Sequence, residues 1–258
     1  MPNIWISSYP KSGNTWVRFM LYAAIYGPPT ISGDVPAKIP DIHRKLPTDL
    51  DPTGPLLIKS HFELTDQHPL IEDTLKAIHI IRNPRDVLLS ALNYRKLGTD
   101  STFPITNKRY AKSFLSHKGD PGFKGIGFGT WASQARSWRS TTKFPVLKLS
   151  YEQLKEEPES QLRAMLEFIQ IERSEEQIKQ ALSASSFDAM RAMEIREKNN
   201  EKLKKLGKRF FVGTTGATRK GVYFMNKGES NQSLDTIYNG LDAQFAVAFK
   251  DELAEFGY

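Results

Sequence analysis

The 258 residues contain no cysteine, which excludes disulfide bonds, thiolate catalysis and cysteine-ligated zinc. The apolar stretches are too short to span a bilayer, and no charged-then-apolar leader precedes Trp5. No acidic cluster of the kind that binds a metal ion is visible either. These absences favour a cytoplasmic protein that has no membrane span and needs no metal.

The composition is ordinary for one large α/β domain, with 39% hydrophobic and 25% charged residues. No repeat or domain boundary is visible, so we predict a single domain over residues 1–258. The net charge of +7 suits an anionic ligand such as a doubly phosphorylated nucleotide, although a basic surface that serves solubility gives the same number. We expect a small-molecule partner rather than a nucleic acid.

The order of apolar runs and helical patterns predicts the architecture. Strands are expected at 3–8, 56–60, 76–82 and 145–149. Helices are expected at 14–26, 84–92, 106–117, 128–140, 151–156, 158–169, 174–183, 186–204 and 239–256. Strands that alternate with helices predict an α/β fold with a central parallel sheet of about four to five strands, flanked by helices on both faces.

The segment from Ile4 to Trp16 has the pattern of a buried strand, a tight turn and the start of a helix. Free backbone N–H groups and the helix dipole converge at such a junction, and Lys11 adds a mobile cation. The common nucleotide loop, G-x-x-x-x-G-K-[ST], places its lysine after the glycines, whereas here Lys11 precedes Ser12-Gly13. We therefore expect a phosphate or sulfate group, held by a loop of another type.

This loop, Tyr9-Pro10-Lys11-Ser12-Gly13-Asn14-Thr15-Trp16, resembles the Y-P-K-[SA]-G-[TN]-T-W loop of sulfotransferases. Those enzymes use 3′-phosphoadenosine 5′-phosphosulfate (PAPS) and have a P-loop-like, three-layer α/β fold. The resemblance implies that the 5′-phosphosulfate is held by Lys11, Ser12, Gly13, Asn14 and Thr15, with Trp16 stacked on the adenine. It extends over roughly residues 3–257, with the motifs in the family's order.

A second segment, Arg82-Asn83-Pro84-Arg85-Asp86-Val87-Leu88-Leu89-Ser90, resembles the family's R-N-P-[RK]-D-x-x-x-S motif. The resemblance assigns Arg82 and Ser90 to the 3′-phosphate. An arginine fork can form bidentate, charge-assisted bonds to a phosphate, and a hydroxyl completes the cradle. The alternative is an ordinary strand end followed by a helix start.

Lys59-Ser60-His61 follows the second predicted strand and resembles the family's K-[ST]-H segment, whose histidine is the catalytic base. A polar residue at the carboxyl end of such a strand faces the binding crevice, and histidine can take a proton near pH 7. Lys11 and Lys59 would neutralise charge on the leaving oxygen. We interpret the other histidines as structural; they are His43, His68, His79 and His117.

Three later segments are assigned to the nucleotide by resemblance. The adenine would be approached by Tyr151, in the segment Tyr151-Glu152-Gln153-Leu154. It would also be approached by Ser185 and Phe187, in the segment Ser185-Ser186-Phe187-Asp188-Ala189-Met190. The two aromatic residues could equally be core residues. The family's late R-K-G-x-x-G-D-W motif is altered. Its candidates are Arg219-Lys220-Gly221 and Asn226-Lys227-Gly228, of which the second has the better position and resembles the bacterial glycopeptide-antibiotic branch.

We therefore predict a sulfotransferase that moves the sulfuryl group from PAPS to a hydroxyl, or alternatively an amine, and releases adenosine 3′,5′-bisphosphate (PAP). The acceptor would be a small molecule, a natural product or a glycan, in a pocket shaped by loops 28–55, 62–72, 96–127 and 205–226. A kinase on the same fold and a non-catalytic nucleotide-binding protein are the alternatives. Oligomeric state is open.

Overall fold

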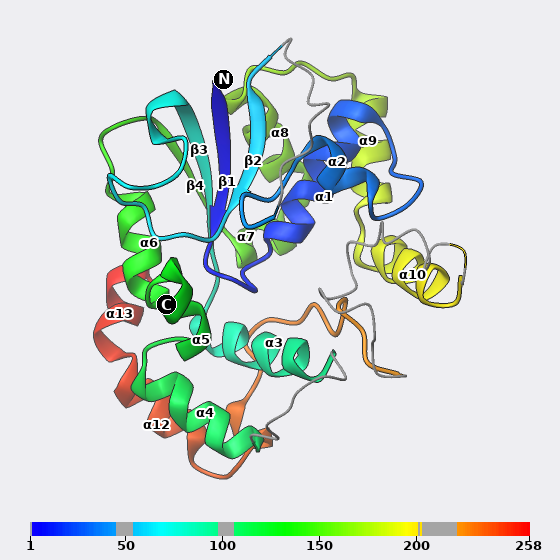
Figure 1. Ribbon diagram of the computed structural model, residues 1–258. Coiled ribbons are helices and arrows are strands. Elements are labelled where there is room, and N and C mark those ends of the chain that lie inside the picture. The colour runs from blue at the N-terminus through cyan, green and yellow to red at the C-terminus, as the bar shows by residue number, and fades with distance from the viewer. Residues whose placement is uncertain (1, 45–53, 98–105, 201, 203–220) are drawn as a thin grey trace.

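The protein is described by a computed structural model that covers residues 2–44, 54–97, 106–200, 202 and 221–258. Its centre is a four-stranded parallel sheet with the strand order β2-β1-β3-β4 (Figure 1). The strands are β1 (Asn3–Ser8), β2 (Leu56–Ser60), β3 (Thr74–Ile81) and β4 (Val146–Ser150). The predicted parallel sheet between helices is confirmed.

Helices lie between these strands and after the last strand. They are α1 (Asn14–Tyr26), α2 (Asp34–Lys38), α3 (Pro84–Leu97), α4 (Asn107–Ser116), α5 (Pro121–Phe123), α6 (Trp131–Arg139), α7 (Tyr151–Glu156), α8 (Pro158–Phe168), α9 (Glu175–Ala184), α10 (Phe187–Lys198), α12 (Leu241–Ala248) and α13 (Lys250–Phe256). Short turns η1 (Ile71–Asp73), η2 (Lys124–Phe128) and η3 (Leu234–Thr236) complete them.

Alternate residues of β1 build the two faces of the sheet. Ile4 and Ile6 pack into a core with α1, α8 and α9, whereas Trp5 packs on the opposite face against Trp138 of α6. All six residues of β1 are buried, as expected for a central strand that is covered on both sides. The rigid centre of the fold is therefore the strand that leads into the predicted anion loop.

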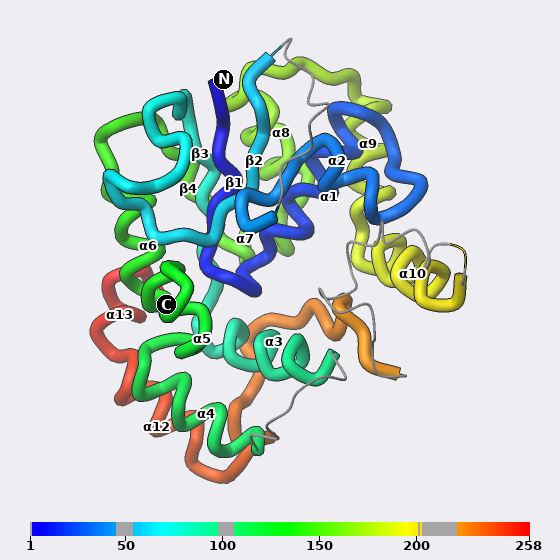
Figure 2. Tube along the Cα trace, viewed as in Figure 1, coloured from blue at the N-terminus to red at the C-terminus, as the bar shows by residue number. Residues whose placement is uncertain are grey.

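A third apolar cluster lies beyond the carboxyl ends of the strands, where α3, α4 and α12 pack together. The segment 221–240 runs beside α3 (Figure 2), and Asn93 Nδ2 of that helix donates to the carbonyl of Tyr223 at 2.8 Å. Asp86 accepts from the backbone N–H groups of Asn231 and Gln232 at 3.0 and 3.2 Å. These bonds hold residues 221–240, called the late loop below, over the edge of the sheet where the strands end.

Two helix predictions need correction. The helix expected over 239–256 is two helices, α12 and α13, which are separated at Phe249 (φ −110°, ψ 15°). The bend buries the Phe249 ring completely, in contact with Phe114 and Trp131. The helix expected over 186–204 ends at Lys198. Among the described residues, none of the helices combines the length and apolarity that crossing a membrane requires.

Candidate active site

The turn between β1 and α1 leaves backbone N–H groups free to bind an anion. Lys11 and Gly13 both adopt positive φ angles, 72° and 102°, which turn the chain sharply into the helix. The first N–H groups of α1 have no intrahelical partner. The hydroxyl of Ser12 is buried and has no hydrogen-bond partner among the described residues. Asn14 fastens the helix start to β1, because its Nδ2 donates to the carbonyl of Ile6 at 2.9 Å.

Two glycines allow aromatic rings to lie directly on the backbone. A Cβ at Gly13 would lie 2.7 Å from Tyr151 Cδ2, and one at Gly228 would lie 2.9 Å from Phe187 Cδ2. Trp16 meets the Tyr151 ring edge-on, with ring centroids 5.7 Å apart. Aromatic side chains from α1, α7 and α10 therefore gather at one end of the site, where they offer planar surfaces for a purine.

Arg82 follows β3 and connects the anion loop to the late loop. Its Nη1 donates to the carbonyl of Lys11 at 3.2 Å, and its Nη2 donates to the carbonyl of Glu229 at 2.8 Å. The guanidinium lies 4.0 Å from the centre of the Tyr151 ring, and Nε is buried without a partner among the described residues. In this structure one N–H of each terminal nitrogen thus binds a backbone carbonyl, which leaves Nε–H and the second N–H of each terminal nitrogen for an anion.

His61 is oriented by the strand beside it. Its Nδ1 lies 2.7 Å from the carbonyl of Ser8, so Nδ1 carries the proton and Nε2 keeps the free electron pair. Burial, together with the neighbouring Lys59 and His43, holds the pKa of the imidazole well below its usual range. His61 is therefore neutral near pH 7, in the form that can accept a proton.

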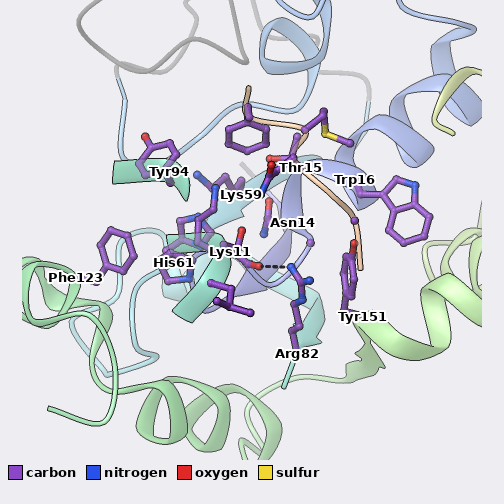
Figure 3. Close-up of a pocket in the computed structure, with 18 of the residues that line it drawn as sticks. Lys11, Asn14, Thr15, Trp16, Lys59, His61, Arg82, Tyr94, Phe123 and Tyr151 are labelled. Atoms are coloured by element: carbon purple, nitrogen blue, oxygen red, sulfur yellow. Dashed lines mark hydrogen bonds between the residues drawn. The ribbon is translucent and has the colours of Figure 1, made fainter. Parts of the chain in front are cut away.

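Two lysines lie near His61 (Figure 3). Lys59 Nζ forms an ion pair with Asp41 Oδ2 at 2.7 Å, and burial lowers the pKa of Lys59 to about 8 even though Asp41 opposes the shift. Lys11 Nζ lies 4.3 Å from the centre of the Tyr94 ring and 4.1 Å from that of Phe224. Burial, followed by repulsion from Arg82 and Lys59, lowers the pKa of Lys11 to about 7.

A cavity of about 420 Å³ joins these groups. The predicted site residues that line it are Lys11, Gly13, Asn14, Thr15, Trp16, Lys59, His61, Arg82, Ser90, Tyr151, Phe187, Lys227 and Gly228. Figure 3 shows Trp16 and Tyr151 at one end and Phe123 and Tyr94 at the other, with Lys59 and His61 between them. Short motifs far apart in the sequence thus meet at the ends of the strands, as open parallel sheets favour.

Some predicted site residues do not line the cavity. Ser12 is fully buried and is not among the lining residues. Ser185 does not line the cavity, because it is buried at the end of α9 and its hydroxyl donates to the carbonyl of Ala181 at 2.7 Å. Arg219 and Lys220 lie outside the described residues. Within the described part of the chain, loop 62–72 contributes no lining residue, contrary to expectation, because Phe62 packs behind the wall against His43 and Phe128.

Several lining residues were not predicted from the sequence. Leu89 and Tyr94 lie on α3, and the others lie on loops and short turns without periodic patterns: Asp41, His43, Arg44, Phe123, Ile126, Phe128, Phe224 and Met225. His43, interpreted above as structural, accepts a hydrogen bond at its Nε2 from the backbone N–H of His61 at 2.8 Å. Its signal in the sequence is weak, since a lone histidine in a proline-rich loop carries no spacing that points to the site.

Comparison with known proteins places the chain in a family. A family model described as a sulfotransferase domain matches residues 1–257. Sulfotransferase 1A1 of Mus musculus is 28% identical over 203 residues, which are 73% of this chain and 67% of that protein. The chain spans about two thirds of the length of the curated relatives it matches.

Solved structures share the fold at low sequence identity. Mouse sulfotransferase SULT7A1 complexed with PAP has a TM-score of 0.67 and 18% identity, over 98% of this chain and 84% of that one. Retinol dehydratase in complex with androsterone and the inactive cofactor PAP has a TM-score of 0.69 and 17% identity, over 97% and 80%. Because the family model extends over nearly the whole chain, the protein belongs to the sulfotransferase family of enzymes.

Proposed function

We propose that the protein transfers the sulfuryl group of PAPS to a hydroxyl group of an apolar small molecule. One observation carries this proposal. A single cavity joins an aromatic end, at Trp16 and Tyr151, to a second apolar end, at Tyr94 and Phe123, and His61 lies between the two. A transfer reaction needs such an arrangement, because donor and acceptor must meet in line at one base.

The donor end has groups that fit a phosphorylated nucleotide. Arg82 Nε is a buried donor without a partner among the described residues, and it suits an anionic oxygen together with the free N–H groups at the start of α1. Arg82, Ser90 and the Lys227-Gly228 turn would hold the 3′-phosphate, and Tyr151 and Phe187 the adenine. The PAP bound in two similar structures supports this assignment.

The chemistry needs one base and positive charge. His61 Nε2 would take the proton of the acceptor hydroxyl while that oxygen forms its bond to sulfur. The bond from sulfur to the bridging phosphate oxygen breaks, its electron pair stays on that oxygen, and PAP leaves. Lys11 and Lys59 would neutralise this oxygen, the electrostatic stabilisation on which such transfers depend.

The acceptor end favours an apolar molecule. Phe123, Ile126 and Phe128 from the segment after α4 line it, together with Phe224, whose ring centre lies 6.2 Å from that of Tyr94. These side chains offer large apolar surfaces and few hydrogen-bonding groups, which a polar glycan would need. Androsterone in one of the similar structures is consistent with this class of acceptor. We therefore favour an alcohol or phenol on an apolar skeleton over an amine or a sugar.

Calorimetric titration tests the donor directly, with PAP beside 5′-AMP and ATP–Mg²⁺. The proposal expects binding that requires the 3′-phosphate and weakens in Arg82→Ala. Preference for ATP–Mg²⁺ would favour a kinase, and PAP binding without any transfer from radiolabelled PAPS would favour a non-catalytic protein. A single domain over 1–258, a cytoplasmic location and a bacterial origin remain predictions from the sequence, and the oligomeric state is open.

A further inference from the structure

Asp41 occupies a position that the proposed mechanism leaves without a role. It is 7% exposed and lies in the wall of the cavity. The segment around it runs parallel to β2: the N–H of Lys59 donates to the carbonyl of Pro40 at 2.8 Å, and the N–H of Ile42 donates to the carbonyl of Lys59 at 3.1 Å. These backbone bonds fix the Asp41 carboxylate beside the end of β2, where both Lys59 and His61 lie.

The carboxylate binds on two sides. Its Oδ2 forms the 2.7 Å ion pair with Lys59 Nζ, and its Oδ1 accepts from the backbone N–H of His43 at 3.1 Å. His43 in turn accepts from the backbone N–H of His61, and the two imidazoles are stacked with an interplanar angle of 11°. One carboxylate therefore touches the lysine directly and reaches the base through His43.

The charges around Lys59 are mostly positive. Arg18, Arg44 and Lys11 all repel its ammonium, and Asp41 is the carboxylate that opposes them. Burial alone would raise the pKa of Asp41, but Lys59, His61 and Arg18 together hold that pKa well below its usual range. The carboxylate is therefore ionised near neutral pH. Burial lowers the pKa of His43 to about 4, which keeps its Nε2 an acceptor.

We infer that Asp41 is a positioning residue for sulfuryl transfer: its carboxylate keeps Lys59 protonated and in place, and fixes His43 beneath His61. This inference rests on the proposed function. Without the carboxylate, Lys59 would lose its proton at a lower pH, because an opposite charge at ion-pair distance shifts a pKa by about 1–3 units. The lysine would then contribute less charge at the leaving oxygen.

Asp41→Asn tests this with little change in shape. The alkaline limb of kcat/KM for PAPS should contain two steps, from Lys11 near pH 7 and from Lys59 near pH 8. In Asp41→Asn the Lys59 step should move down by about one pH unit or more, and the rate above it should fall about tenfold for each unit. PAP affinity below the limb should stay near that of the wild type. Asp41→Glu keeps the charge but displaces the carboxylate, so it should leave the alkaline limb of kcat/KM in place and lower kcat.

Glu197→Gln is the matched control. Glu197 is a buried carboxylate that also accepts two hydrogen bonds but does not line the cavity.

A double-mutant cycle separates a positioning role from a merely structural one. In a Lys59→Met background, Asp41→Asn should cost less activity than in the wild type, because the part of its effect that passes through the lysine is already lost and only the part through His43 remains. Equal costs in both backgrounds, or an unmoved alkaline limb, would overturn the inference. If Asp41→Asn does not fold, Asp41→Glu provides the test. A wild-type kcat in Asp41→Glu would refute the positioning role of Asp41. Failure of the wild type to bind PAP would refute the proposed function itself.

Discussion

His61→Asn separates the proposed role of His61 as a base from its structural role. The asparagine Nδ2 can take the place of His61 Nδ1 and still donate to the carbonyl of Ser8, which the histidine contacts at 2.7 Å. The backbone N–H that donates to His43 is unchanged. What disappears is Nε2, the nitrogen with the free electron pair. The substitution therefore removes the proton acceptor and leaves the anchoring bonds of this segment in place.

The size of the effect follows from the loss of one general base. Such a group contributes roughly 10²–10⁴-fold, or about 3–5 kcal/mol of transition-state stabilisation. We expect kcat to fall by this amount, while PAP affinity changes by no more than about threefold, under 1 kcal/mol. The assay is transfer of radiolabelled sulfate from PAPS at saturating acceptor, with calorimetric titration of PAP on the same preparation.

A second histidine provides the control. His79 is fully buried in β3, where its Nε2 lies 3.2 Å from Gln134 Oε1, and it does not line the cavity. His79→Asn should lower stability but keep most of the activity. A loss of less than tenfold in His61→Asn, or an equal loss in both variants, would show that His61 is not the base.

Two further predictions concern the anion loop. Burial lowers the pKa of Lys11 to about 7 and that of Lys59 to about 8, and a bound anion raises both pKa values. PAP affinity should therefore be highest below pH 7 and fall as the pH rises from 7 to 8 and above. A constant PAP affinity in a calorimetric pH series would contradict this prediction. Gly13→Ala should cost about 1–2 kcal/mol of backbone strain and also displace Tyr151, which weakens PAP binding. Gly240→Ala, at φ 82° with open space around it, should show the strain alone in denaturant unfolding, and equal PAP affinity in both variants would count against the clash.

Local patterns in the sequence predicted much of the fold and many of the residues that line the cavity. The apolar runs at 3–8 and 56–60 are the strands β1 and β2 with the same bounds. The turn around Gly13 begins a helix at Asn14, as expected. These features depend on neighbouring residues, since periodicity, a positive-φ glycine and free N–H groups at a helix start are properties of short segments.

The tertiary structure decided which loops complete the site. Asp41 and His43 reach His61 because their segment runs along the edge of β2, and Phe224 reaches Lys11 because α3 holds the late loop. Ser185 shows the converse, since a local bond to Ala181 takes up the hydroxyl that the motif assigned to the nucleotide. The sequence by itself determined the strands, the anion loop and the order of the motifs. Only the packing of distant segments, which no local pattern encodes, decided the partners of Lys59 and His61 and the apolar side chains that line the cavity.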